Sequence, residues 1–126
     1  MNKRRLAHII SVTEIDESKK PSYLHIAQPV TIKSMLVAQK AAAQTVDVEL
    51  FAIKHKAEKV NLPEGFGWAK DIDLYAWEYI DGLREFHPHK PLPRLCDILE
   101  GLYNVSYAEF FIYTNVHMGL YPNFWL

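Results

Sequence analysis

Three short segments carry apolar residues at the spacing or density of β-strands. Residues 6–12 form a mostly apolar, β-branched run between polar turn residues, which predicts a buried strand. Residues 46–53 alternate between polar and apolar and then become apolar, which predicts a strand nearer the edge of a sheet than its centre. Residues 108–114 are almost continuously apolar, as in a central parallel strand that is covered on both faces.

Other segments have apolar residues at helical spacing. Residues 29–44 predict a helix with Pro29 in its first turn, where the missing N–H costs no hydrogen bond. Its apolar face consists of Ile32, Met35, Leu36 and Ala43. A second helix follows Arg94, with a stripe made of Leu95, Ile98, Leu99 and Leu102. A short helix is predicted within 71–80, and the segments 14–23 and 54–70 are predicted as loops because they contain proline, glycine and polar residues.

The order of these elements predicts an α/β fold, a Rossmann-like layered domain with a mainly parallel sheet. The length of 126 residues corresponds to a single domain, residues 1–126. Ligands of such sheets bind beyond the carboxyl ends of the strands. Those ends are predicted at residues 11–13, 54–55 and 115–118, so we look for function there.

Composition and charge exclude several classes of protein. With 23% charged residues, 3 Trp, 7 Tyr and 6 Phe, the chain is not intrinsically disordered. A formal net charge of -1 argues against a nucleic-acid binder, which typically presents a basic surface. No apolar run approaches the roughly 20 residues of a transmembrane helix, and the run after Arg5 lacks the features of a signal peptide. We therefore expect a cytoplasmic protein without a transmembrane segment.

The cysteine and histidine residues indicate little metal or redox chemistry on their own. The one cysteine, Cys96, excludes an intrachain disulfide and a Cys-rich zinc site, and its place in an apolar-patterned helix predicts a small buried side chain. His87 and His89 offer two imidazoles in a loop, but no nearby residue completes a zinc site. His8 lies inside the first predicted strand, so we expect a hydrogen-bonded histidine in or near the core.

The segment 111–124 carries the most specific pattern of the chain. It contains Tyr-Thr-Asn-Val-His-Met followed by Pro-Asn-Phe, and it resembles a segment of glycosyltransferase-like proteins of the A-type nucleotide-diphospho-sugar transferase fold. In those relatives the corresponding core reads Tyr-Thr-Asn-Val-Asp-Ile, then a short link and Pro-x-Phe. The segments 6–10, 26–31 and 46–50 are similar to other parts of the same proteins, so the resemblance covers most of the chain in order.

The resemblance implies a nucleotide-sugar-binding domain that corresponds to the nucleotide-facing half of a full transferase and is truncated relative to it. Its nucleotide contacts would be Ile10, Ser11, Val12, Gln28 and Asn115. A divalent cation, Mn²⁺ or Mg²⁺, neutralises the diphosphate in such chemistry, and the positions that would hold it here are Asn115 and His117. Because His117 stands where the relatives show Asp, the site lacks a carboxylate, and an imidazole suits Mg²⁺ poorly. No residue is assigned as catalytic base.

A second interpretation is a non-catalytic binding or interaction module, a truncated relative of the same fold. In this case an exposed sheet edge, or the apolar tail formed by Phe124, Trp125 and Leu126, would pair with another chain as a homo-oligomer. Two of the predicted site residues also have a purely structural interpretation. Gln28 can open an ordinary helix, and Asn115 can stabilise a turn.

Overall fold

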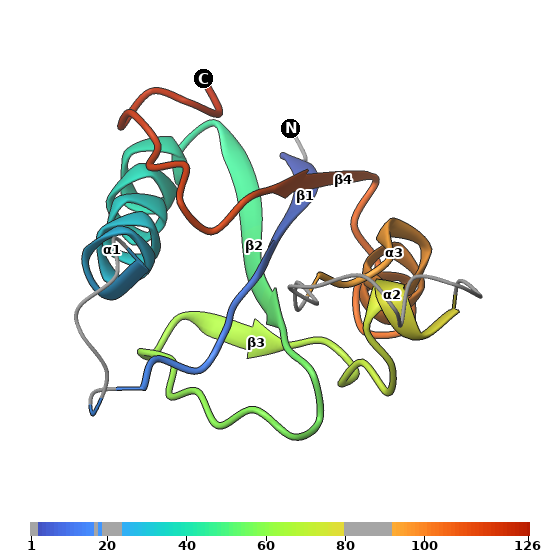
Figure 1. Cartoon of the computed structure of the whole chain (residues 1–126). Helices are drawn as coiled ribbons and strands as arrows, with labels where there is room; N and C mark the ends of the chain where they lie inside the picture. The colour runs from blue at the N-terminus through green and yellow to red at the C-terminus, as the bar shows by residue number, and fades with distance from the viewer. Residues whose placement is uncertain (1–2, 17, 19–23, 80–91) are drawn as a thin grey trace.

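The computed structural model describes residues 3–16, 18, 24–79 and 92–126. Along the chain these form β1 (Arg4–Ser11), α1 (Leu24–Ala42), β2 (Val46–Ile53), β3 (Phe66–Trp68), α2 (Ala76–Tyr79), α3 (Leu95–Tyr103) and β4 (Phe110–Thr114). The four strands form one sheet in the order β3-β2-β1-β4, and every neighbouring pair is parallel. The predicted α/β, Rossmann-like layered fold is therefore confirmed (Figure 1).

The helices cover the two faces of this sheet, with α1 on one side and α2 and α3 on the other (Figure 1). Because successive side chains of a strand point to opposite faces, each strand supplies two separate cores. On the α1 face, Ile10 of β1 packs with Met35 of the helix. On the α3 face, Ile9 packs with Ile98 and Leu102. Burial on both faces explains why the run around Ile9 and Ile10 is continuously apolar.

The predicted positions of two strands within the sheet are wrong. β2, expected near an edge, lies between β1 and β3, whereas β4, expected at the centre, pairs with β1 alone among the described strands. The apolar character of β4 reflects partial cover on its two faces and not a second neighbour, and Phe110 is 51% exposed. The alternation in β2 has a local cause, since Asp47 and Glu49 lie at the amino end of the α3 face, where charged partners replace an apolar cover.

Several element boundaries also differ from the prediction. α1 begins at Leu24 and not at residue 29, so Pro29 lies inside the helix and cannot donate the helical hydrogen bond to the carbonyl of His25. The predicted loop 54–70 contains β3, which is only three residues long and pairs with residues 50–52 of β2. The short helix predicted within 71–80 is limited to α2 in the described part.

The helical stripe of α3 is narrower than predicted. Ile98 and Leu102 are buried, whereas Leu95 and Leu99 are exposed. Cys96 is also exposed, so the expectation of a buried cysteine is wrong. The nine-residue helix presents one turn-to-turn row to the sheet at positions i and i+4, and a helix that packs on one side only leaves the rest of its surface in solvent.

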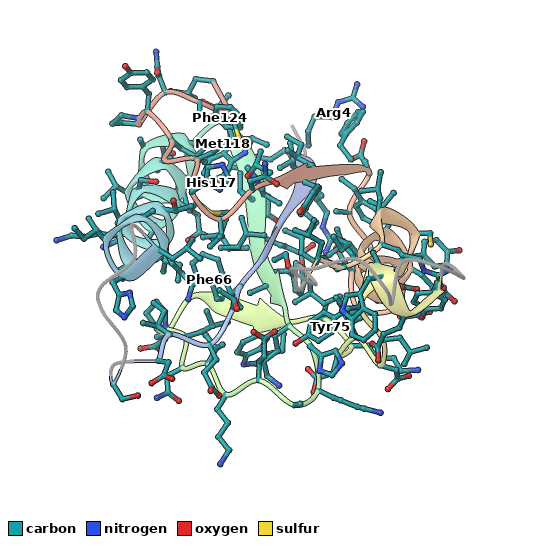
Figure 2. All side chains as sticks on the ribbon, viewed as in Figure 1. Arg4, Phe66, Tyr75, His117, Met118 and Phe124 are labelled. Atoms are coloured by element: carbon teal, nitrogen blue, oxygen red, sulfur yellow. The ribbon has the colours of Figure 1, made fainter. Side chains whose placement is uncertain are left out.

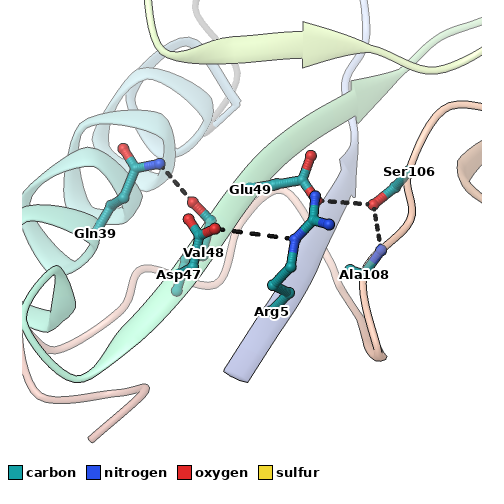
Figure 3. Close-up of polar contacts among 7 residues, drawn as sticks. All are labelled: Arg5, Gln39, Asp47, Val48, Glu49, Ser106 and Ala108. Carbon is teal, nitrogen blue, oxygen red and sulfur yellow. Dashed lines mark hydrogen bonds and ion pairs between the residues drawn. The ribbon is translucent and has the colours of Figure 1, made fainter. Parts of the chain in front are cut away.

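Polar side chains contact the part of β2 that does not pair with β3. The side-chain amide of Gln39 in α1 donates a 2.7 Å hydrogen bond to the carbonyl oxygen of Val48, at a point of β2 that β3 does not reach (Figure 3). On the other face Arg5 lies between Asp47 and Glu49, with N–O distances of 3.9 and 3.7 Å. The hydroxyl of Ser106 donates to Glu49 and thereby holds the segment after α3 against the sheet.

The segment after β4, residues 115–126, returns over the α1 side of the sheet (Figure 1). Ser34 of α1 accepts a 2.9 Å hydrogen bond from the backbone N–H of Leu120 and so fixes this segment to the helix. Further along, the rings of Phe124 and Trp125 pack against His8 at centroid distances of 5.8 and 5.5 Å. His8 is fully buried and its Nε2 lies 2.7 Å from Thr114 Oγ1, which confirms the expected hydrogen-bonded core histidine. None of the described helices is long and apolar enough to span a membrane.

Candidate functional site

In the strand order β3-β2-β1-β4, the order of strands along the chain reverses between the neighbours β1 and β4. From β1 the chain crosses to β2 through α1, and it reaches β4 from β3 by way of α2 and α3 on the opposite face. In open α/β sheets the crevice outside the carboxyl ends of two such strands is the usual place for a ligand. A cavity of about 330 Å³ lies there, lined by residues that follow β1, β2 and β4.

Four of the predicted site residues line this cavity, which we call the strand-end cavity. Ser11 and Val12 come from the end of β1, and Asn115 and His117 come from the segment after β4. Val12 is held in place by a 2.9 Å hydrogen bond from its N–H to the carbonyl of Ile53. The side chains of Asn115 and His117 are exposed, and Figure 2 shows His117 on the segment that leaves β4. Two segments more than 100 residues apart in the chain therefore meet at one site.

The other two predicted nucleotide contacts lie elsewhere. Ile10 is fully buried in the core on the α1 face and does not line the strand-end cavity. Gln28 is also buried, and its amide group is engaged by the backbone of Thr13. Its Oε1 accepts from the Thr13 N–H at 3.0 Å, and its Nε2 donates to the Thr13 carbonyl at 2.9 Å. Gln28 thus fixes the loop after β1, which carries part of the cavity wall.

Residues from two further loops line the strand-end cavity and were not among the predicted site residues. The ring of His55 stacks on the ring of Tyr75, with centroids 4.1 Å apart and planes inclined by 14°. His55 Nδ1 accepts a hydrogen bond from the N–H of Ala57, so the neutral ring carries its proton on Nε2. These loops meet because residues 55 and 72 form an isolated parallel bridge that continues the sheet beyond β2. The position of His55 at a strand end was the available sequence signal.

Glu58 is the acidic group of the strand-end cavity. One of its oxygens accepts hydrogen bonds from the hydroxyl of Thr13 and from the backbone N–H of Glu14, which ties the loop after β2 to the loop after β1. Burial raises the pKa of the Tyr75 phenol, and the carboxylate of Glu58, with which it hydrogen-bonds, raises it further. Burial likewise raises the pKa of Tyr113. Both phenols are therefore protonated at neutral pH. The Tyr75 hydroxyl donates to the Glu58 carboxylate and the Tyr113 hydroxyl to Asn115 Oδ1 at 3.4 Å, so each phenol oxygen can still accept a hydrogen bond.

The lining of the cavity has a definite chemical character. Its ionisable groups are one carboxylate, two imidazoles and two phenols, and neither lysine nor arginine lines it in the described part of the chain. Apolar side chains such as Leu24, Ile72 and Val116 form most of the remaining wall. Such a surface suits a flat, partly polar ring, whereas it supplies little positive charge for a diphosphate.

The predicted metal site is not completed by the residues that the structure describes. Over residues 3–16, 18, 24–79 and 92–126, no group of three or more His, Cys, Asp or Glu side chains could hold a metal ion. Asn115 and His117 supply one amide oxygen and one imidazole, which is fewer protein ligands than a stable site needs. His87 and His89 lie outside the described residues. A divalent cation at this position therefore remains a prediction from the sequence.

Comparisons with known proteins add no identity to this geometry: no protein-family model, no curated protein sequence and no solved structure matches the chain.

Proposed function

We propose that this domain binds a nucleotide sugar, with the nucleoside part in the strand-end cavity. The observation that carries the proposal is that Ser11, Val12, Asn115 and His117, taken from two distant segments, line one cavity at the crevice between β1 and β4. The cavity volume of about 330 Å³ falls in the range of small-molecule sites. Supporting features are the aromatic stack of His55 and Tyr75 and the polar side chains around the cavity.

In this arrangement each group has a specific task. The Ser11 hydroxyl hydrogen-bonds the nucleoside, and the phenol oxygen of Tyr75, whose proton is donated to Glu58, accepts a hydrogen bond from it. Asn115 and His117 face the phosphate groups, where an amide N–H and an imidazole N–H serve as donors. Because the described residues lack the ligands for a cation, the proposal does not depend on Mn²⁺ or Mg²⁺. Sugar transfer is not assigned to any residue.

Calorimetry with UDP- and GDP-sugars, with and without Mn²⁺, tests the proposal. We expect binding that weakens about tenfold in Asn115→Ala and in His117→Ala, because each loses a hydrogen bond to a charged group. Asn104→Ala is the matched control, since Asn104 caps α3 and does not line the cavity. The proposal fails if no nucleotide sugar binds at millimolar concentration, or if the control weakens binding equally. His117→Asp, measured with Mn²⁺, shows whether a carboxylate creates a metal requirement.

An interaction module is the second candidate function, favoured by the side of β4 on which no described strand pairs. Among the described strands, β4 pairs only with β1, and its first residue Phe110 and the preceding Tyr107 are exposed. Unpaired edge strands are sites where another chain can pair. We propose a homo-oligomer formed through this edge, and analytical ultracentrifugation tests it. A strictly monomeric protein at high concentration counts against it.

The free, exposed Cys96 suits a reducing compartment such as the cytoplasm.

A further inference from the structure

A second cavity, of about 540 Å³, lies between α1 and the loop that follows β2. Its walls come from α1, from Ile15 after β1, and from residues 59–63 of the loop. It shares only Thr13 with the strand-end cavity, so the two are separate sites. We call it the helix–loop cavity.

The floor of the helix–loop cavity is apolar and continuous with the core. Ile32 is buried in the α1-face core, and Leu36 and Val60 pack against that core while still lining the cavity. The loop approaches the helix closely at Gly65, which has a φ of 105°, and a Cβ there would come within 2.9 Å of Leu36 Cδ2. A Cβ at this position would displace the Leu36 methyl group, and the positive φ is strained for any other residue, so glycine suits this close approach of the loop to α1.

Two lysines are the ionisable residues of this cavity. Lys33 lies on α1 and Lys59 lies on the loop, and no acidic residue lines the cavity in the described part of the chain. The neighbouring lysines differ in this respect, since Lys54 pairs with Asp71 at 3.2 Å and Lys56 with Asp73 at 3.7 Å. Within the described residues, neither Lys33 nor Lys59 has an ion-pair partner. Two ammonium groups beside one apolar cavity attract an anion.

The lining offers less to a nucleotide than the strand-end cavity does. In contrast to the strand-end cavity, none of the described residues that line the helix–loop cavity is aromatic or histidine, so they offer a base no ring to stack on. The amide of Gln28 is already engaged by the backbone of Thr13 and offers little further recognition. What remains is apolar surface with two cations and the neutral polar side chains of Thr13 and Asn61.

We infer that the helix–loop cavity binds a single-chain amphipathic anion, with its carboxylate or phosphate between Lys33 and Lys59 and its apolar chain over Leu36 and Val60. The charge of the two lysines complements the anionic group, and the cavity volume accommodates one short chain. This site is independent of the proposed nucleotide-sugar site, because it has its own lining and its own charge.

The test is a calorimetric titration of the whole chain with decanoate below its critical micelle concentration. We expect decanoate to bind, acetate not to bind, and decanol to bind without depending on the lysines. The double variant Lys33→Gln, Lys59→Gln should lower decanoate affinity about tenfold, which corresponds to losing both charged contacts. Lys40→Gln, on the last turn of the same helix and outside the cavity, should leave it unchanged.

Each contrary result overturns the inference. Equal binding of acetate and decanoate would show that the apolar floor contributes nothing. Unchanged decanoate affinity in the double variant would show that the lysines do not bind the anion. Binding to phosphatidylglycerol vesicles without binding to free decanoate would identify a membrane surface as the partner. Titration of the double variant with a nucleotide sugar separates the two proposals, because the strand-end cavity retains all of its lining residues.

Discussion

The two faces of the sheet are covered by different chemistry. The α3 face is closed by an aliphatic row, Ile98 and Leu102, on Ile9 and Ile53 of the strands. The α1 face has a larger apolar core, but it also buries the polar side chains of His8, Gln28 and Thr31. The one other buried polar residue in the described chain, Ser106, lies beyond the end of α3.

This difference separates stability from function in the molecule. Beyond the ion pairs of Arg5 at its amino end, the α3 face depends on apolar packing. The α1 face instead holds the loop after β1 through Gln28 and the segment after β4 through Ser34 and His8. These are the two segments that supply the predicted residues of the strand-end cavity. The polar groups on the α1 face therefore position the candidate site, at the cost of a dependence on pH.

The largest expected effect concerns the α3 face. Leu102→Ala should lower the free energy of unfolding by about 3 kcal/mol, because Leu102 is fully buried and the truncation leaves a cavity. The loss, measured by urea unfolding, should be the same at pH 7 and pH 5. Leu99→Ala on the same helix is the control, and we expect less than about 1 kcal/mol because Leu99 is exposed. Equal losses in the two variants would contradict a packed row on α3.

The next effect concerns the α1 face and its dependence on pH. Burial lowers the pKa of His8 from 6.5 to about 4, and its Nδ1 has no hydrogen-bond partner among the described residues. Between these values the unfolded chain binds a proton that the folded chain excludes. Stability is therefore complete above about pH 6.5 and falls as the pH is lowered towards 4, by up to about 3 kcal/mol.

The variant His8→Gln isolates this contribution. It cannot titrate, so the slope of unfolding free energy between pH 4 and 6.5 should flatten relative to the original chain, whatever the change in overall stability. Urea unfolding at intervals across this window provides the measurement. An unchanged slope would assign the pH dependence to other groups and would remove this distinction between the two faces.

A smaller effect is expected from Gln28. Gln28→Ala removes two hydrogen bonds to Thr13 and leaves the backbone groups of that loop to find new partners, so we expect a loss of about 2 kcal/mol. Thermal or urea unfolding measures the stability, and calorimetry with a nucleotide sugar measures the site. If Gln28 holds the loop, affinity falls together with stability. Weaker binding at undiminished stability would instead support the direct nucleotide contact predicted from the sequence.

The smallest effect concerns the exposed amino end of the sheet. Arg4 and Glu109 form an ion pair at 3.0 Å, but both side chains are well exposed. Arg4→Ala should therefore lower the free energy of unfolding by less than about 1 kcal/mol, and the loss should shrink further in high salt. Urea unfolding at low and high ionic strength checks this. A loss as large as that of Leu102→Ala would show that surface charge contributes as much as the packed core.

The candidate site could be predicted where it follows strand ends, and not where loops meet. Ser11, Val12, Asn115 and His117 were predicted from the family resemblance, and all four lie at predicted strand ends, where the structure places the strand-end cavity. His55 and Tyr75 lie 20 residues apart in polar segments, and no local pattern indicates that their rings stack. The same resemblance predicted Ile10 and Gln28 as contacts, but both side chains are buried and neither lines the strand-end cavity.

The sequence by itself determined the α/β class, the two main helices and three of the four strands. The reason is that apolar periodicity and β-branched runs act locally, through the side chains of neighbouring residues. Tertiary structure decided the order of the strands, which placed β2 inside the sheet and β4 at its edge. An apolar run indicates that both faces of a strand are covered, but it does not indicate which strand lies beside it. The same physical reason applies to both cavities, because their walls come from segments that only the folded chain brings together.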